Sequence, residues 1–409
     1  MIKIRRKIQL TGDDGFKILL VLVWTRTILT SYAYQTLLRI PFINQIADEI
    51  KVFVYIVATL FAMNVIIKRQ SLVDIFWGIF IIAGYFVNID LFPLTAEYLV
   101  NNVATILCVA FPAYYIGTSM INEDYIDTLH KWSRICLYAI VVYFLVFGFK
   151  AEVGRVEAEN MGVAYRILPH LVMVMLYAFT KGKKTDIVLS IVGSILLLAC
   201  GTRGPVVGVV LFFLVYVLFL YQSKKKWYFV AGLSIVSLLM LMDMRILITP
   251  LTALLDHFGF STRVVNALLT GELANDNGRN EIMLTMMNML KANNYQGFGL
   301  AGDRNIVFWM AYSHNIILEL CVTFGLYYGT FIFSLICYIL LRSIFVANSN
   351  EKGFIISLVF GGGFFKLFLT SSFLLEYQFF FLLGYCVSIL RKYRKKRKVV
   401  NSNENRVLY

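Results

Sequence analysis

Long apolar runs recur along almost the whole of this 409-residue chain, separated by polar connections that are mostly short. A helix that crosses a bilayer needs about 20 mostly apolar residues, because its backbone must satisfy its own hydrogen bonds in hydrocarbon. Hydrophobic residues make up 59% of the chain and charged residues only 15%, too few to cover the surface of a soluble protein. We therefore expect an all-α integral membrane protein.

Twelve runs are candidate membrane spans. They lie at 16–38, 50–67, 72–89, 99–120, 132–149, 163–180, 185–201, 204–222, 227–243, 314–341, 353–370 and 373–390. The sequence thus predicts a single polytopic membrane domain over residues 1–409, with a large extracytoplasmic loop at 244–313 and a basic cytoplasmic tail at 391–409. The first run has no small-residue cleavage site and is too long for a signal peptide, so we expect an uncleaved span.

The basic residues indicate how these spans are oriented. If the N-terminus is cytoplasmic, every strongly basic connection falls on the inner side and both termini lie inside. These connections contain Lys68-Arg69, Lys181 to Lys184, Lys224 to Lys226 and the run Arg391 to Lys398. The formal net charge of +14 would suggest nucleic acid in a soluble protein. Here the charge excess indicates orientation and an anionic inner leaflet, so no nucleic-acid partner is expected.

The long outer loop contains a segment with helical periodicity. Between 280 and 293, apolar residues recur as Ile282, Met286, Met289 and Leu290, which predicts one apolar face of a helix. Such a helix could lie at the membrane surface or cap a cavity between spans. Loops of about 70 residues are usually functional.

Three positions on the predicted outer side carry side chains suited to binding an anion. Arg203 lies in a glycine-flanked hairpin between two apolar spans, and its planar guanidinium suits a phosphate. Arg279 opens the amphipathic segment of the loop. His314 begins the tenth span, with Ser313 as a plausible N-cap and helix N–H groups directed toward an anion. The alternative for each is an interfacial side chain that only meets lipid headgroups.

Other polar residues near or within the spans are weaker candidates. Arg166 and His170 lie four residues apart near the outer end of the sixth span, so one helix face could present both to a cavity. A snorkelling interfacial pair is an equally good interpretation. Arg26 and Lys366 fall inside predicted spans, where charges usually face a cavity. The six cysteines form no CxxC pair and have no histidine at metal-ligand spacing, so no disulfide framework or metal site is expected.

The order of these motifs resembles the O-antigen polymerase/ligase superfamily. The matching elements are Thr202-Arg203-Gly204 between spans, a large outer loop, Arg279, Gly297-Phe298-Gly299, and His314-Asn315-x-x-Leu318-Glu319 followed by Gly325 and Gly329. The resemblance covers about residues 185–330 in motif, and the whole chain in span number and charge topology. The family's aromatic residue one turn after the loop arginine is replaced by Met283, and its proline before the glycines is absent.

The resemblance implies an inverting glycosyltransferase that needs neither metal nor cofactor. It would polymerise undecaprenyl-diphosphate-linked oligosaccharide repeat units into O-antigen or capsule on the outer face of the bacterial cytoplasmic (inner) membrane. Its partners would be this lipid-linked substrate, membrane lipids, a chain-length regulator and a flippase. The implied roles are His314 as base, Arg203 and Arg279 as diphosphate-binding residues, and Asn315 and Glu319 as supporting residues. Their shared helix face makes Arg166 a further diphosphate-binding candidate and His170 a further supporting one.

Three alternatives remain open from the sequence. A ligase that transfers finished polymer to lipid A-core would share the reaction and the superfamily, and would differ in its acceptor. A flippase or transporter for the lipid-linked unit would usually show paired half-chain repeats. No such symmetry is visible, although Gly361-Gly362-Gly363 is a candidate helix break. A non-catalytic scaffold would leave the outer arginine and histidine residues unexplained.

Overall fold

The computed structural model describes residues 12–28, 57, 59–147, 156–200, 202–220, 253, 278–307 and 313–407. Every regular element among these residues is a helix, and none is a strand, which confirms the all-α prediction for the described part of the chain. Five segments are long and apolar enough to cross a membrane: Leu72–Leu91, Pro93–Thr118, Gly162–Lys181, Arg203–Leu220 and Leu326–Val346. The expected span at 227–243 lies outside the described residues, and those at 16–38 and 50–67 lie partly outside.

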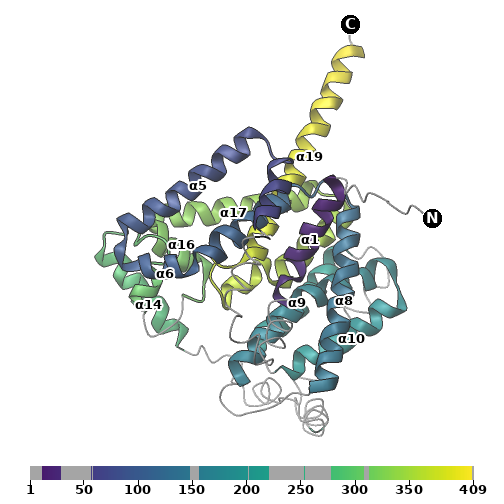
Figure 1. The fold of residues 1–409 in the computed structure, drawn as a ribbon, viewed down its shortest axis with the longest axis horizontal. Coiled ribbons are helices and arrows are strands. Elements are labelled where there is room, and N and C mark those ends of the chain that lie inside the picture. The colour runs from purple at the N-terminus through teal and green to yellow at the C-terminus, as the bar shows by residue number, and fades with distance from the viewer. Residues whose placement is uncertain are drawn as a thin grey trace, which may run out of the picture.

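Figure 1 shows the helices of the described residues packed around one another, with α19 projecting beyond them. The first half comprises α1 (Gly12–Ile28), α5 (Leu72–Leu91), α6 (Pro93–Thr105), the π-helical turn η2 (Ile106–Ala110), α7 (Phe111–Thr118), α8 (Asp124–Phe147) and α9 (Val156–Lys181). The second half comprises α10 (Lys184–Ala199), α11 (Arg203–Val215), the π-helical turn η3 (Tyr216–Leu220), α14 (Arg279–Ala292), α15 (Asp303–Ile306), α16 (Ile316–Phe324), α17 (Leu326–Val346), α18 (Ser349–Leu358), the π-helical turn η5 (Val359–Gly363), the 3-10 helix η6 (Phe365–Phe368) and α19 (Tyr377–Val407).

The core forms where apolar helices approach closely. Helix α9 packs against α8, α10 and η5, and its residues from Ile167 to Val174 are fully or almost fully buried. Helix α19 packs against α7, where a Cβ on Gly117 or Gly384 would clash with the backbone of the other helix. Helix α5 instead buries only Gly78 and Tyr85, so most of its apolar surface is exposed, as expected of a helix that faces lipid.

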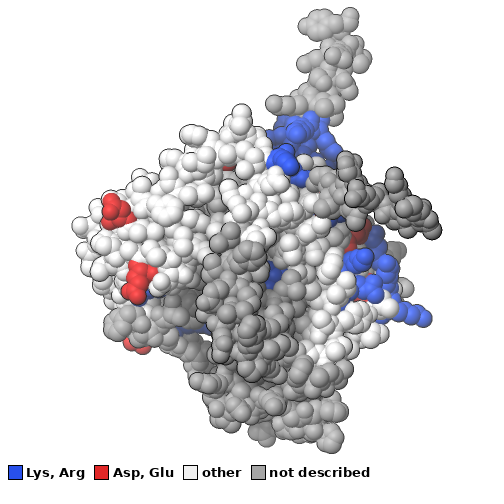
Figure 2. All heavy atoms as spheres, viewed as in Figure 1, with Lys and Arg blue, Asp and Glu red and all other residues white. Residues whose placement is uncertain are grey.

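The predicted basic connections that the structure describes meet at one end of the helical bundle, called the basic end below; Lys224 to Lys226 lie outside the described residues. Figure 2 shows Lys and Arg concentrated where α19 leaves the body and along the adjoining edge. Four side-chain pairs join the helix termini there: Arg69 with Asp13, Arg391 with Asp74, Lys392 with Glu351, and Asn348 with Glu123. The charge pattern of the sequence therefore corresponds to a real grouping of helix ends in space.

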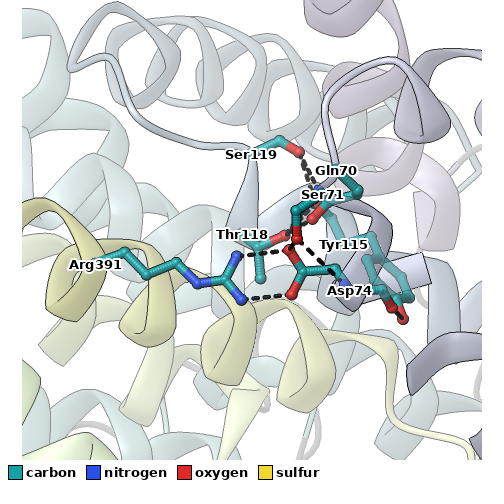
Figure 3. A network of polar contacts seen from close by, with 7 residues as sticks. All are labelled: Gln70, Ser71, Asp74, Tyr115, Thr118, Ser119 and Arg391. Carbon is teal, nitrogen blue, oxygen red and sulfur yellow. Dashed lines mark hydrogen bonds and ion pairs between the residues drawn. The ribbon is translucent and has the colours of Figure 1, made fainter. Parts of the chain in front are cut away.

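A polar network at the basic end joins the start of α5 to α7 and α19 (Figure 3). The Arg391 guanidinium donates to both carboxylate oxygens of Asp74, at 2.5 and 3.1 Å. The Gln70 side-chain amide donates to the Thr118 and Ser119 hydroxyls, at 3.0 and 2.8 Å. These contacts connect elements that are far apart in the sequence and fix the relative positions of their ends.

Two predicted spans are broken. The expected helix at 314–341 divides at Gly325 (φ 86°) into α16 and α17, and these pack so closely that a Cβ on Gly329 would meet the α16 backbone. The expected helix at 353–370 is interrupted at Gly362 (φ 124°), a conformation that only glycine adopts readily. The last span begins at Tyr377, and its helix continues through the described part of the basic tail to Val407.

The amphipathic helix of the long loop is confirmed as α14. Its buried residues are Ile282, Met286 and Leu290, whereas Met289 is exposed, contrary to the predicted face. The buried face packs against α15 and α16, with Val322 in the shared apolar cluster. The helix therefore covers protein and does not lie on the membrane by this face. Of the predicted loop at 244–313, the structure describes only residues 253, 278–307 and 313.

Candidate functional site

The backbone carbonyl of Leu369 joins two of the predicted site residues. Nη2 of Arg279, the first residue of α14, donates to this oxygen at 3.2 Å. The Leu369 backbone also interacts with the ring of His314, just before α16, and counteracts part of the lowering of its pKa. Leu369 itself follows the short helix η6 in the broken segment. Three separate parts of the chain thus meet at Leu369.

Arg203 lies beside the same group. It is the first residue of α11, and its neighbour Gly204 packs so tightly that a Cβ there would lie 3.2 Å from Cδ1 of Leu369. The Tyr165 hydroxyl occupies the rest of that space, so a larger residue than glycine would displace it. The structure therefore brings Arg279, His314 and the backbone next to Arg203 close to Leu369, and we call these residues the Leu369 cluster.

The backbone around His314 differs from the predicted helix start. His314 has φ 55°, in the left-handed region that non-glycine residues rarely adopt. Asn315, not Ser313, is the N-cap, and its side-chain oxygen accepts from the N–H groups of Ile317 and Leu318 at 2.9 and 3.5 Å. The expectation that this helix terminus presents its N–H groups to an anion is therefore wrong, because Asn315 occupies them.

The electrostatics keep His314 neutral near pH 7. Burial is the largest cause that lowers its pKa, and the positive charge of Arg279 lowers it further. When one ring nitrogen donates to the carbonyl of Leu369, the other nitrogen of the neutral imidazole carries a lone pair. His314 is thus oriented by a backbone group and poised as a proton acceptor.

A buried charge network lies directly behind this cluster. The Arg304 guanidinium pairs with Asp303 and lies 3.4 Å from Oε1 of Glu319. Glu319 accepts hydrogen bonds from the Ser372 hydroxyl and, at 3.1 Å, from the Phe373 N–H. Burial, with the charge of Asp303 next, raises the pKa of the Glu319 carboxyl. The network ties α15 and α16 to the turn that follows Leu369.

This network also holds the backbone next to His314. The Ser313 N–H donates to Oδ2 of Asp303 at 3.0 Å, one residue before the left-handed His314. Asp303 is itself fixed by Arg304, and Arg304 reaches the ring of Tyr98 on α6, with Cζ 5.0 Å from the ring centroid. Glu319 is therefore a supporting residue in a structural sense, since it acts through Arg304 and the 372–373 turn.

A second ion pair lies in the broken segment. Lys366, on η6, pairs with Glu376, which also accepts from the Ser371 hydroxyl at 3.2 Å. The Lys366 ammonium lies 5.4 Å from the ring centroid of Tyr165, the residue that abuts Gly204. The Arg26 guanidinium lies 5.8 Å from the ring of Tyr377, the first residue of α19.

The structure does not bring His170 into the cluster. The side chain is fully buried, 3.4 Å from the Ser133 hydroxyl and edge-on to the ring of Trp24. The expectation that His170 faces a cavity with Arg166 is wrong, because His170 belongs to the packed core between α1, α8 and α9. Arg166, one turn earlier on α9, is half-buried.

The sequence interpretation missed Asp303, Arg304 and Glu376. In the sequence, Asp303-Arg304 is typical of solvated loop residues, and Glu376 is typical of an interfacial charge at the start of a span. Among the described residues, no group of three or more His, Cys, Asp and Glu side chains is arranged to hold a metal ion. A cavity of about 120 Å³ lies near the basic end, between α8, α9 and α18, with Asp127, Tyr177 and Lys181 in its wall.

In comparisons with known proteins, no family model, curated protein or solved structure matches this chain. The functional argument therefore depends on the sequence motifs and on the geometry of the Leu369 cluster.

Proposed function

We propose that this protein is a membrane glycosyltransferase that polymerises undecaprenyl-diphosphate-linked oligosaccharides into a surface polysaccharide. One observation supports this most: Arg279 donates to the backbone oxygen of Leu369, His314 interacts with the backbone of the same residue, and Arg203 lies next to the glycine packed against it. These are the residues that the motif resemblance implies for base and diphosphate binding. They come from three segments with no sequence proximity.

The proposed reaction is a direct displacement at the anomeric carbon of the donor sugar. The bond from that carbon to the diphosphate oxygen breaks, and the diphosphate leaves with the electron pair. The hydroxyl oxygen of the acceptor sugar forms the new bond from the opposite face, which inverts the configuration. His314 accepts the hydroxyl proton, and the guanidinium groups of Arg203 and Arg279 stabilise the charge on the leaving diphosphate.

The remaining predicted residues take distinct places in this proposal. Arg166 lies on α9, one residue after Tyr165, whose hydroxyl abuts Gly204, so it is a candidate for the rim of the diphosphate site. Asn315 caps α16 directly after His314, and Glu319 binds Arg304 and the turn at Phe373, so both are assigned positioning roles.

The distribution of charge supports an orientation for the reaction. From Tyr377 to Arg391 helix α19 rises roughly 21 Å, which separates the Leu369 cluster from the basic end. If the basic end faces the cytoplasm, as the positive-inside rule favours, the cluster lies toward the outer leaflet of the inner membrane. Lipid-linked substrate would then be met on that side.

Purified protein with a lipid-diphosphate repeat unit provides the test. We expect a ladder of elongated products without added nucleotide or metal. Transfer of preformed polymer to lipid A-core, with no elongation, would favour the ligase alternative. In cells, deletion of the gene leaves single repeat units on the surface lipid if the protein is a polymerase, and leaves none if it is a ligase.

A flippase for the same lipid-linked unit is the second candidate, because the break at Gly362 interrupts a predicted span. Discontinuous helices of this kind line substrate sites in transporters. Proteoliposomes that translocate a labelled lipid-linked unit without forming elongated product would favour this candidate over the polymerase.

A further inference from the structure

The motifs that suggest the function give no role to the ion pair between Lys366 and Glu376. Lys366 lies on η6, between the π-helical turn that contains Gly362 and the turn at Leu369. A continuous apolar helix would make this charge costly, since burial of an ion in low dielectric is unfavourable. Because the helix is broken at Gly362, Lys366 lies on the short helix η6. It precedes Leu369 by three residues and belongs to the segment that forms the candidate site.

The two members of the pair are held differently. The Glu376 side chain is 6% exposed and accepts a second hydrogen bond, from the Ser371 hydroxyl at 3.2 Å. The Lys366 side chain is 18% exposed and lies over the face of the Tyr165 ring. An ammonium has three donors on a flexible stem, so it can exchange or share a partner while the carboxylate stays in place.

The position of Tyr165 connects Lys366 to Arg203. The ammonium lies 5.4 Å from the ring centroid, and the hydroxyl of the same ring abuts Gly204, the neighbour of Arg203. Leu369 contacts Gly204 and accepts from Arg279. Lys366 and the two arginines thus lie next to the same packed group, which consists of Tyr165, Gly204 and Leu369. The carboxylate of Glu376 compensates one of the three positive charges.

We infer that Lys366 is a third cation for the diphosphate of a polyprenyl-linked substrate, held by Glu376 until the anion binds. The inference rests on the proposed function, because it names the same substrate class and the same site. Replacement of a buried ion pair by apolar groups is often neutral or stabilising, so stability alone gives little reason for a charged pair at this place. An arriving diphosphate offers the ammonium a more highly charged partner than the single carboxylate.

The chain contains a matched control pair at the basic end. Lys392 and Glu351 form an ion pair at 2.6 Å, with side-chain exposures of 30% and 7%. It has the same residue types and similar burial, but it lies far from the Leu369 cluster along α19. Variants of the two pairs therefore separate a role in binding from a general effect of breaking a lysine–glutamate pair.

The test measures binding of undecaprenyl diphosphate to the purified full-length protein. Lys366→Met is expected to weaken the affinity about tenfold, the factor that about 1.4 kcal/mol represents. Glu376→Gln is expected to tighten it, because the ammonium loses its competing partner, and the double variant is expected to bind as weakly as Lys366→Met. Lys392→Met and Glu351→Gln are expected to leave the affinity unchanged.

The opposite signs for the two single variants make the inference falsifiable. Equal weakening by Lys366→Met and Glu376→Gln, with recovery in the double variant, would mean that the pair only supports the fold. Lys366→Arg, which retains the charge, should keep most of the affinity if Lys366→Met proves unstable. Equal losses for undecaprenyl diphosphate and phosphatidylglycerol would indicate an unspecific anion contact and overturn the inference. Competition by inorganic pyrophosphate would support recognition of the diphosphate itself.

The outcome is distinguishable from failure of the proposed function. If the protein forms no polymer but Lys366→Met still weakens diphosphate binding, the polymerase proposal fails and the binding site stands. If the protein forms polymer and Lys366→Met binds and elongates as the wild type does, the inference about Lys366 fails alone.

Discussion

The two ends of the helical bundle use charge in different ways. At the basic end, most ion pairs join the termini of well-formed helices and remain partly exposed, as between Arg391 (44%) and Asp74 (14%), whereas Asp186 is buried beside His130 and Arg134. At the other end, Asp303, Arg304 and Glu319 form a network with side-chain exposures between 0 and 10%. All five non-glycine residues with positive φ in the described chain lie in segments of this second end: Asn294, Tyr295, Ala301, His314 and Ser371.

This contrast separates a structural role from a functional one. Exposed pairs at helix ends contribute little energy, but they report which ends lie together. Buried charges and left-handed residues cost free energy and persist only where their surroundings over-determine them, which is typical of active sites. The left-handed His314 and Ser371 and the buried network of Asp303, Arg304 and Glu319 therefore support the site that the motifs suggest. The predictions below test the contrast between the two ends.

The largest expected difference concerns the central arginine of each ion-pair system. Arg304→Met leaves two buried carboxylates uncompensated, so we expect a loss of about 3–5 kcal/mol in the free energy of unfolding. Arg391→Met breaks an exposed pair and should cost less than about 1 kcal/mol. Unfolding of both variants in the same detergent measures the difference. Similar losses would mean that the buried network contributes no more to the free energy of unfolding than the exposed pair does.

The second prediction concerns close backbone approach. A Cβ on Gly297 would clash with the carbonyl of Thr323 and lie 2.7 Å from the Gly325 N atom, so Gly297→Ala should destabilise by about 1–3 kcal/mol. On α5, Gly84 has nothing within 4 Å of its built Cβ. Gly84→Ala should be neutral or stabilise by about 0.5–1 kcal/mol. Thermal unfolding of the two variants should therefore give shifts of opposite sign or clearly different size.

The third prediction uses the pH dependence of elongation. In the proposed mechanism the neutral form of His314 is the base, so activity should fall as the pH drops through its lowered pKa. Arg279→Gln removes a charge that lowers this pKa, so the acid limb should move to higher pH. Arg279→Lys retains the charge and should leave the limb in place while elongation slows. An unshifted limb in Arg279→Gln would contradict the coupling of these two residues.

The smallest effect is expected from salt. The ion pair between Arg391 and Asp74 is partly exposed, so its contribution should decline as ionic strength rises. The difference in stability between wild type and Arg391→Met should therefore shrink between low salt and 1 M salt. The corresponding difference for Arg304→Met should remain nearly constant, because the buried network is little screened. Equal salt dependence would contradict the contrast in burial.

Helix content and the grouping of basic connections could be predicted from the sequence. Both follow from local patterns: apolar length for the helices, and Lys and Arg content for the connections. The face of α14 was largely predictable for the same reason, because a period of 3.6 residues identified Ile282, Met286 and Leu290. Met289 was misplaced because the extent of the buried face depends on what packs against it.

The break at Gly325 was harder to predict, whereas the run Gly361-Gly362-Gly363 marked the break at Gly362 as a candidate. Apolar composition continues through both glycines, so a hydropathy window reads one span where the backbone has two segments. The N-cap was misassigned for a similar reason, since Ser313 and Asn315 are both good caps. The bond from Ser313 N–H to Asp303 decides between them, and this contact is long-range.

The membership of the site was partly predictable. Arg203, Arg279 and His314 stood out as isolated polar residues at the ends of apolar segments. Asp303 and Glu376 did not, because their importance arises from pairing with Arg304 and Lys366 in the folded chain. His170 was included on helical spacing alone, but it is enclosed by Trp24 and Ser133.

The rate of elongation in a single turnover, with donor binding measured on the same samples, tests the central claim most directly. The account predicts that His314→Ala binds undecaprenyl-diphosphate-linked donor as the wild type does and elongates it at least about 100-fold more slowly. Arg391→Ala, at the basic end, should retain both binding and rate. Elongation by His314→Ala at the wild-type rate would contradict the assignment of the catalytic base, and with it the Leu369 cluster as the active site.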